Sequence, residues 1–181
     1  MFINLRDKQL VEIRFLETND ELNLFKYFEK LSTETKSRYG PHSFDHQTVH
    51  EICLNPSEGI KRYIAIDPAN NIIIAYMLVK DGLIESDEQR FAERDIHFDS
   101  ETACTFAPSI ADNWQSAGLG TAMFDIIETD LKLLGKRIII LWAGVQASNK
   151  KAVLYYRKIG FVEVGTFIFN NIDNYDMIKE I

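Results

Sequence analysis

A glycine-containing loop between a predicted strand and a predicted helix constrains this chain most. The loop runs from Gln115 to Thr121, with Gly118 and Gly120 inside it, and an amphipathic segment from Ala122 to Leu134 follows. Backbone N–H groups and the positive end of a helix dipole converge at such a place, and glycine permits a positive φ or a close ligand. The pattern predicts a phosphate-binding loop, although glycine before a helix also serves simply to turn the chain.

A second motif lies downstream and makes this interpretation more specific. Asn149 precedes a helical run from Lys150 to Lys158, which closes with Ile159-Gly160-Phe161. Asparagine is a favoured residue before the first turn of a helix, and glycine is favoured just after the last turn. The two motifs together are far more specific than either one alone.

Both motifs resemble those of one enzyme family. The segment from Gln115 to Gly120 resembles the pyrophosphate loop of the GNAT superfamily of N-acetyltransferases. The family's second signature is matched at Asn149, Ala152, Tyr156, Gly160 and Phe161. The sequence departs from the first motif at Ser116 and Ala117, where members usually have arginine or glycine. Backbone donors would therefore have to hold most of the phosphate charge.

The resemblance implies a fold and an activity. The fold class is α/β, a GNAT-like mixed and mostly antiparallel twisted sheet of six to seven strands, flanked by about four helices and splayed at a bulged central strand. The whole chain, residues 1–181, would be one such domain. The implied activity is direct transfer of an acetyl group from acetyl-CoA to a primary amine, either of a small molecule or of a protein. Whether the protein forms a homodimer by pairing its last two strands is left open.

The resemblance also assigns residues to the site. Tyr156 matches the family's general acid, and its alternative reading is a buried aromatic residue. For the general base the sequence offers Glu101, His97 and Asp99, with a solvated charge cluster as the alternative. The predicted acetyl-CoA contacts are Ser109, Ile110, Ala111, Gln115, Ser116, Ala117, Gly118, Leu119, Gly120, Thr121, Asn149 and Tyr156. No metal is expected.

Composition limits the function classes. The 181 residues and 46% hydrophobic content suit a single domain with a substantial core. A formal charge of −7 argues against nucleic acid as a partner, because duplex binding normally needs a basic face; it favours cationic substrates. Only Cys53 and Cys104 are present, which indicates reduced, mostly buried thiols rather than a disulfide scaffold. No stretch approaches the ~20 apolar residues of a membrane helix, so a cytoplasmic protein with no membrane partner is expected.

Periodicity predicts the remaining elements. Residues 10–16 alternate between apolar and charged side chains, and residues 60–66 form a β-branched and aromatic run, so each segment is expected to be a strand. Residues 72–79 form a similar run after a turn-forming segment, which predicts a hairpin with residues 60–66. Helices are expected from residue 18 and over 45–53, with a loop over 32–46. The charged segment 81–99 is either a short helix or a flap. Further strands are expected over 102–111, 137–145, 161–169 and 175–180.

Two local features refine the site. Pro108 lies inside the predicted strand 102–111, where it removes a ladder hydrogen bond. In the resembled fold the strand bulges here and exposes backbone groups to pantetheine; an ordinary edge strand is the alternative. In that fold the loop that here contains Arg38, Tyr39, His42 and Phe44 borders the acceptor pocket. The alternative is an ordinary surface loop.

The sequence also allows two other functions. One is a catalytically inactive module that binds CoA or acyl-CoA and serves as a sensor or assembly subunit, which the absence of a clear base favours. The other is a generic nucleotide-phosphate binder. The latter is disfavoured because no Lys-Ser/Thr pair follows Gly120, as it does in a Walker loop.

Overall fold

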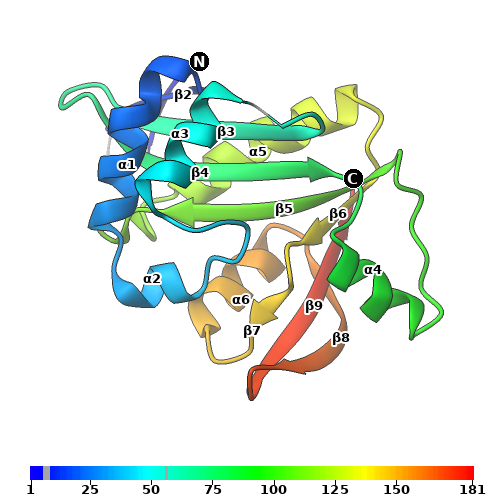
Figure 1. Ribbon diagram of the computed structural model, residues 1–181. Coiled ribbons are helices and arrows are strands. Elements are labelled where there is room, and N and C mark those ends of the chain that lie inside the picture. Colours follow the sequence, from blue (N-terminus) through cyan, green and yellow to red (C-terminus); the bar gives the residue numbers. More distant parts are fainter. Residues whose placement is uncertain (6–8, 56) are drawn as a thin grey trace. The chain divides into compact units, whose positions relative to one another are not determined.

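The computed structural model describes residues 1–5, 9–55 and 57–181 (Figure 1). It divides into two compact units. Unit 1 consists of residues 1–79 and 107–127, and unit 2 of residues 80–106 and 128–181. Two strands and one helix pass from one unit into the other, and each unit is described by itself.

Unit 1 holds the N-terminal strands. They are β1 (Phe2–Asn4), β2 (Leu10–Phe15), β3 (Ile60–Asp67), β4 (Ile72–Asp81, to residue 79) and the end of β5 (Ala103–Ile110). β1 pairs with β2 and β2 with β3, both antiparallel, and β4 follows β3 in the strand order. The alternation predicted for β2 is confirmed at Val11 and Ile13, which are buried between the half-buried Glu12 and Arg14, but not at Phe15, which is 50% exposed. β1 was not predicted.

The helical segments of unit 1 are η1 (Thr18–Asp20), α1 (Glu21–Lys30), α2 (Thr33–Ser37), α3 (His46–Leu54), η2 (Asp112–Trp114) and α5 (Leu119–Leu133, to residue 127). α1 and α3 lie in front of the strands and α5 lies behind them (Figure 1). The predicted loop over 32–46 is wrong in part, because α2 forms inside it. Ser32 caps α2 by accepting from the Thr35 N–H at 3.1 Å, and Asp112 accepts from both residues.

Unit 2 holds the remaining elements. They are the start of β5, α4 (Glu85–Ala92), β6 (Ile138–Leu141), β7 (Val145–Gln146), α6 (Lys150–Lys158), β8 (Val162–Phe169) and β9 (Ile172–Glu180). The strand order is β5-β6-β9-β7, with β8 on β9. β5 and β6 are parallel and β9 is antiparallel to its neighbours. The charged segment 81–99 therefore contains a helix, one of its two predicted alternatives.

The predicted strand over 137–145 is interrupted. β6 ends at Leu141, and a turn separates it from β7 because Ala143 and Gly144 have positive φ values of 51° and 67°. A side chain at Gly144 would place its Cβ 2.5 Å from the Tyr175 carbonyl oxygen. Only glycine fits this approach, so the apolar run could not continue as one straight strand.

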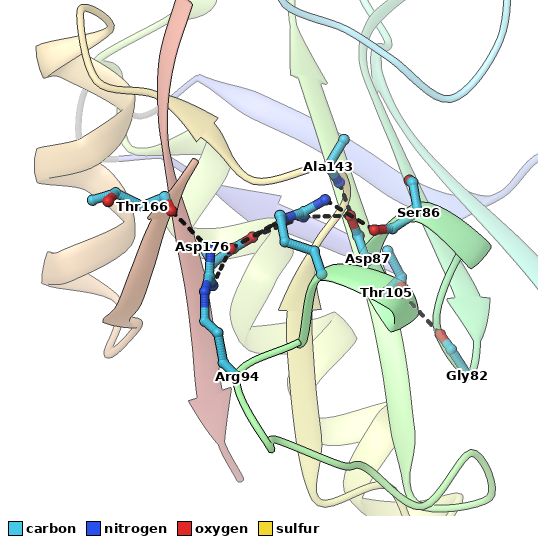
Figure 2. Close-up of polar contacts among 9 residues, drawn as sticks. Gly82, Ser86, Asp87, Arg94, Thr105, Ala143, Thr166 and Asp176 are labelled. Carbon is cyan, nitrogen blue, oxygen red and sulfur yellow. Dashed lines mark hydrogen bonds and ion pairs between the residues drawn. The ribbon is translucent and has the colours of Figure 1, made fainter. Parts of the chain in front are cut away.

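A buried ion-pair network fixes α4 within unit 2 (Figure 2). Asp176 on β9, 1% exposed, accepts from Arg90 at 2.8 Å and from Arg94 at 2.6 Å. Asp87 on α4, fully buried, accepts from Arg90 at 2.6 Å and from the Ala143 N–H at 3.0 Å. Burial raises the pKa of Asp87. The network ties α4 both to β9 and to the turn after β6.

The predicted fold class is confirmed, with a mixed and mostly antiparallel sheet flanked by helices. The described residues form nine strands and six α-helices, more than the six to seven strands and four helices expected. Both cysteines are free and buried, and burial raises the pKa of Cys53 to about 11. None of the helices in the described ranges is long and apolar enough to cross a bilayer.

Candidate functional site

The glycine loop of unit 1 has the backbone geometry of an anion site. It follows η2 and leads into α5, which begins at Leu119. Ser116 and Gly118 adopt left-handed conformations, with φ values of 67° and 89°. Gly120 lies in the first turn of α5 and is not among the glycines with positive φ, so of its two predicted roles it does not make the turn, and the close approach to a ligand stays a prediction. The left-handed turn therefore uses a serine, which the sequence pattern did not indicate.

Backbone donors gather at this loop. Within the described ranges, the N–H groups of Ser116, Ala117 and Gly118 donate to no backbone carbonyl. By the geometry of any α-helix, the N–H groups of Leu119 and Thr121 in the first turn of α5 also lack intrahelical partners. A Cβ added at Gly118 would meet nothing within 4 Å. The loop thus presents amide donors and helix-dipole charge beside open space.

Neighbouring contacts hold the loop in place. The Gln115 side chain donates from Nε2 to the Ile110 carbonyl at 3.2 Å, which closes the loop back onto β5. Trp114 is 7% exposed and buries its ring before the loop begins. Asp112 accepts from Ser32 on the other side, through bonds of 2.8 and 2.9 Å. The donors are therefore carried on a fixed backbone rather than on a free loop.

The strand that leads into the loop contains the predicted pantetheine contacts. The Ala111 N–H donates to the Ile74 carbonyl at 2.9 Å, and the Ser109 and Tyr27 hydroxyls are 2.8 Å apart. Pro108 lies inside β5, as predicted. The register between β5 and β6 runs from Ala103 to Phe106, so the last four residues of β5 extend beyond it. Tyr27, on α1, is a site residue that sequence reasoning missed.

The second motif folds in unit 2 as predicted. Asn149 caps α6 by accepting from the Ala152 N–H at 3.2 Å, and Gly160 ends the helix with a φ of 97°. Tyr156 is 9% exposed and packs against the rings of Tyr155 and Phe161. Burial raises the pKa of Tyr156. Its hydroxyl is therefore protonated at neutral pH, as a proton donor must be.

The three candidate bases lie on an exposed stretch of unit 2. Glu101 is in the turn before β5, where its backbone N–H donates to Asp99 at 2.9 Å. His97 lies 3.6 Å from Asp95, and both side chains are exposed. This placement agrees with the alternative of a solvated charge cluster. Glu101 as the base stays a prediction.

The loop that was expected to border an acceptor pocket packs inward in unit 1. Tyr39, His42 and Phe44 join Phe28 and Tyr76 in one aromatic cluster, with ring centroids 4.9 to 6.3 Å apart. His42 Nε2 is 3.2 Å from the Tyr76 hydroxyl. Arg38 instead forms a surface ion pair with Glu34 at 2.7 Å. In the described part of the chain, no cluster of three or more His, Cys, Asp or Glu side chains could hold a metal.

Comparison with known proteins identifies the fold. No protein-family model and no curated protein matches the sequence. Among solved structures, the GNAT domain of S. lividans PAT superposes with a TM-score of 0.78 at 16% identity, covering 100% of this chain and 96% of that one. This chain has the GNAT fold.

Two further matches of the GNAT fold extend the comparison. Ribosomal-protein-S5-alanine acetyltransferase from Vibrio fischeri has a TM-score of 0.75 at 14% identity, with 99% and 96% of the two chains covered. AAC(6')-Ib, solved in complex with AcetylCoA, has a TM-score of 0.68 at 19% identity, with 94% and 93% covered. Both proteins share the architecture of this chain, and their sequence identities to it are low.

Proposed function

We propose that the protein is an acetyl-CoA-dependent N-acetyltransferase, with its two units acting as one catalytic domain. The observation that carries the proposal is the loop from Gln115 to Thr121. Ser116 and Gly118 are left-handed, and a Cβ at Gly118 would meet open space just before α5 begins, which suits a pyrophosphate bound by backbone amides. Because Ser116 and Ala117 supply no cation, backbone amides and the helix dipole would hold the phosphates. The predicted contacts Ser109, Ile110 and Ala111 would take the pantetheine arm.

The proposed reaction is direct acyl transfer. The neutral amine nitrogen of the acceptor attacks the thioester carbonyl carbon, the C–S bond breaks, and CoA leaves as the thiolate. An alkyl ammonium with a pKa near ~10.4 must first lose a proton to a base or a water chain. The protonated Tyr156 hydroxyl would donate a proton to the departing thiolate, and the proton that the attacking nitrogen loses as the amide forms would restore that hydroxyl. Tyr156 and Asn149 enter this proposal through their match to the second signature.

A pair of glycine variants tests the phosphate loop. Gly118→Ala places a Cβ in the open space beside the amides and strains a backbone with a φ of 89°. Gly135→Ala is the matched control, because Gly135 also has a positive φ, 78°, with nothing within 4 Å of an added Cβ. Both variants should lose about 1 to 2 kcal/mol of stability. Calorimetry should show at least a tenfold weaker acetyl-CoA affinity for Gly118→Ala alone.

Turnover separates the proposed enzyme from an inactive CoA-binding module. Purified protein with acetyl-CoA and a panel of primary amines should release CoA thiol in an acceptor-dependent manner. Tight acetyl-CoA binding without release for any amine would favour the module instead. Competition by ATP as strong as by CoA would indicate a generic phosphate binder and would contradict both.

A further inference from the structure

Arg62 is a buried cation without a carboxylate partner. It lies in β3, within unit 1, and is 9% exposed. Arginine is rarely this buried unless it is paired, because removing its charge from water is costly. Arg62 takes part in none of the ion pairs formed among residues 1–5, 9–55 and 57–181. Its Nε atom is buried and has no hydrogen-bond partner there.

A second polar atom beside this cation also lacks a partner. The hydroxyl of Tyr39 is buried and, like Arg62 Nε, has no hydrogen-bond partner within the described ranges. Burial raises the pKa of Tyr39, and the positive charge of Arg62 acts against that rise. Burial also lowers the pKa of His42, and the Arg62 charge lowers it further. The guanidinium therefore acts directly on the aromatic cluster of Tyr39, His42 and Tyr76.

Arg62 lines a cavity in unit 1. The cavity has a volume of about 360 Å³, the size of a small-molecule site. Ile52, Cys53 and Ile60 supply apolar walls, and the charged lining residues are Lys61, Arg62 and Glu17. The cations outnumber the carboxylate, so this lining favours a small ligand that carries a negative charge and an apolar part.

Side-chain contacts within unit 1 connect this region to the end of β5. The Tyr27 hydroxyl lies 2.8 Å from the Ser109 hydroxyl, on the strand proposed to hold pantetheine. The Tyr27 ring packs on Phe28 at 5.4 Å, and Phe28 packs on Tyr76 at 5.3 Å. Tyr76 in turn interacts with Arg62. A continuous set of side chains thus links Arg62 to the proposed acetyl donor strand.

We propose that Arg62 binds the carboxylate of the acceptor, and that the acceptor is a small amine that also carries a carboxylate, such as an amino acid. This inference rests on the proposed acetyltransferase function. A carboxylate suits the site because a guanidinium offers it two parallel N–H donors, and Lys61 adds a second positive charge to the cavity lining. It also opposes the expectation, from net charge alone, of a purely cationic acceptor.

Matched pairs of amines test the proposal. Each amino acid is compared with its decarboxylated amine: phenylalanine with phenethylamine, tryptophan with tryptamine, and lysine with cadaverine. In the acceptor-dependent release of CoA, at least one carboxylated member should show a kcat/KM at least tenfold above that of its partner. Arg62→Gln should abolish this preference, and Arg62→Lys should retain part of it. Lys132→Gln, which breaks the surface ion pair with Glu128 on α5 and lies outside the cavity lining, should leave the preference intact.

Two further readouts keep this proposal separate from the proposed function. Calorimetry should show that Arg62→Gln binds acetyl-CoA as the wild type does, and that amino acid binding to the protein is lost in the variant even without turnover. Arg62→Gln should also melt at a higher temperature than the wild type, because it removes an unpaired buried charge. Equal rates for acids and amines, or amino acid binding that survives in Arg62→Gln, would overturn the proposal. A protein that binds no acetyl-CoA would instead overturn the proposed function.

Discussion

At the residue scale, the candidate site depends on a few side chains whose surroundings set their chemistry. Burial raises the pKa of Tyr156, so its hydroxyl stays protonated into the alkaline range, and Ser116 adopts a left-handed conformation that serine rarely takes. Such backbone strain persists only where the surrounding structure enforces it, and it concentrates at functional positions. Here Gln115 and Trp114 on one side and α5 on the other enforce it.

Tyr156→Phe tests the proposed general acid. The substitution keeps the ring and its packing against Tyr155 and Phe161, and removes only the hydroxyl. We expect kcat to fall about 10²-fold, the lower end of general acid catalysis, with little change in acetyl-CoA affinity. Tyr155→Phe is the control on the same helix and should keep normal turnover. Full activity in Tyr156→Phe would remove that residue from the mechanism.

At the scale of elements, α4 is attached to unit 2 by buried charges. Asp176 accepts from both Arg90 and Arg94, and Arg90 also lies 3.8 Å from the centroid of the Phe167 ring. Gly165 makes room for this arrangement, since a Cβ there would lie 2.3 Å from the Arg94 guanidinium. Removing one partner of such a network leaves the others buried and unpaired, which costs more than the network contributes in net terms.

Asp176→Asn should therefore be strongly destabilising. Arg94 would lose its charged partner and Arg90 would keep only Asp87, so we expect a loss of about 3 kcal/mol in the free energy of unfolding. Urea denaturation followed by circular dichroism measures it. Glu88→Gln on the exposed side of α4 is the control and should change stability by less than ~0.5 kcal/mol. Equal stabilities for the two variants would show that the network contributes little.

Elements were predictable where local signals determine them, and not where distant residues do. Asn149 and Gly160 mark both ends of α6 in the sequence itself. The short helix α2, by contrast, depends on Asp112, which lies about eighty residues away in sequence and accepts from Ser32 and Thr35. The turn after β6 likewise depends on the carbonyl of Tyr175.

The same distinction between local signals and distant partners applies to the residues of the candidate site. The motif predicted the loop, its helix and the cap at Asn149. It did not reveal Arg62 or Tyr27, because their significance lies in which partners they have or lack after folding. A charged residue inside the apolar run of β3 is the one sequence signal that could have pointed to Arg62.

At the scale of the whole molecule, buried tyrosines link stability to alkaline pH. Burial raises the pKa values of Tyr27, Tyr39, Tyr76 and Tyr156, and that of Tyr76 rises to about 12. A raised pKa in the folded state favours folding below the unfolded value of 10 and loses that contribution as pH rises through the folded value.

Stability should accordingly fall steeply above pH 10. Tyr76 alone accounts for about 2 to 3 kcal/mol between pH 10 and 12, from its shift of about two pKa units. Urea unfolding at pH 8, 10 and 11 measures the slope. Tyr76→Phe should flatten it relative to the wild type. A stability that is level from pH 8 to 11 would contradict this linkage.

The two inaccessible thiols have a practical consequence. Because Cys53 and Cys104 are both buried, and the Cys53 thiol has a pKa of about 11, the native chain should react slowly with maleimides and disulfide reagents at neutral pH. A cysteine introduced at the exposed Leu154 would then be labelled almost alone, and a second on unit 1 would complete a donor–acceptor fluorophore pair. Energy transfer between the two dyes would report, molecule by molecule, whether the distance between the labelled positions changes when substrate binds.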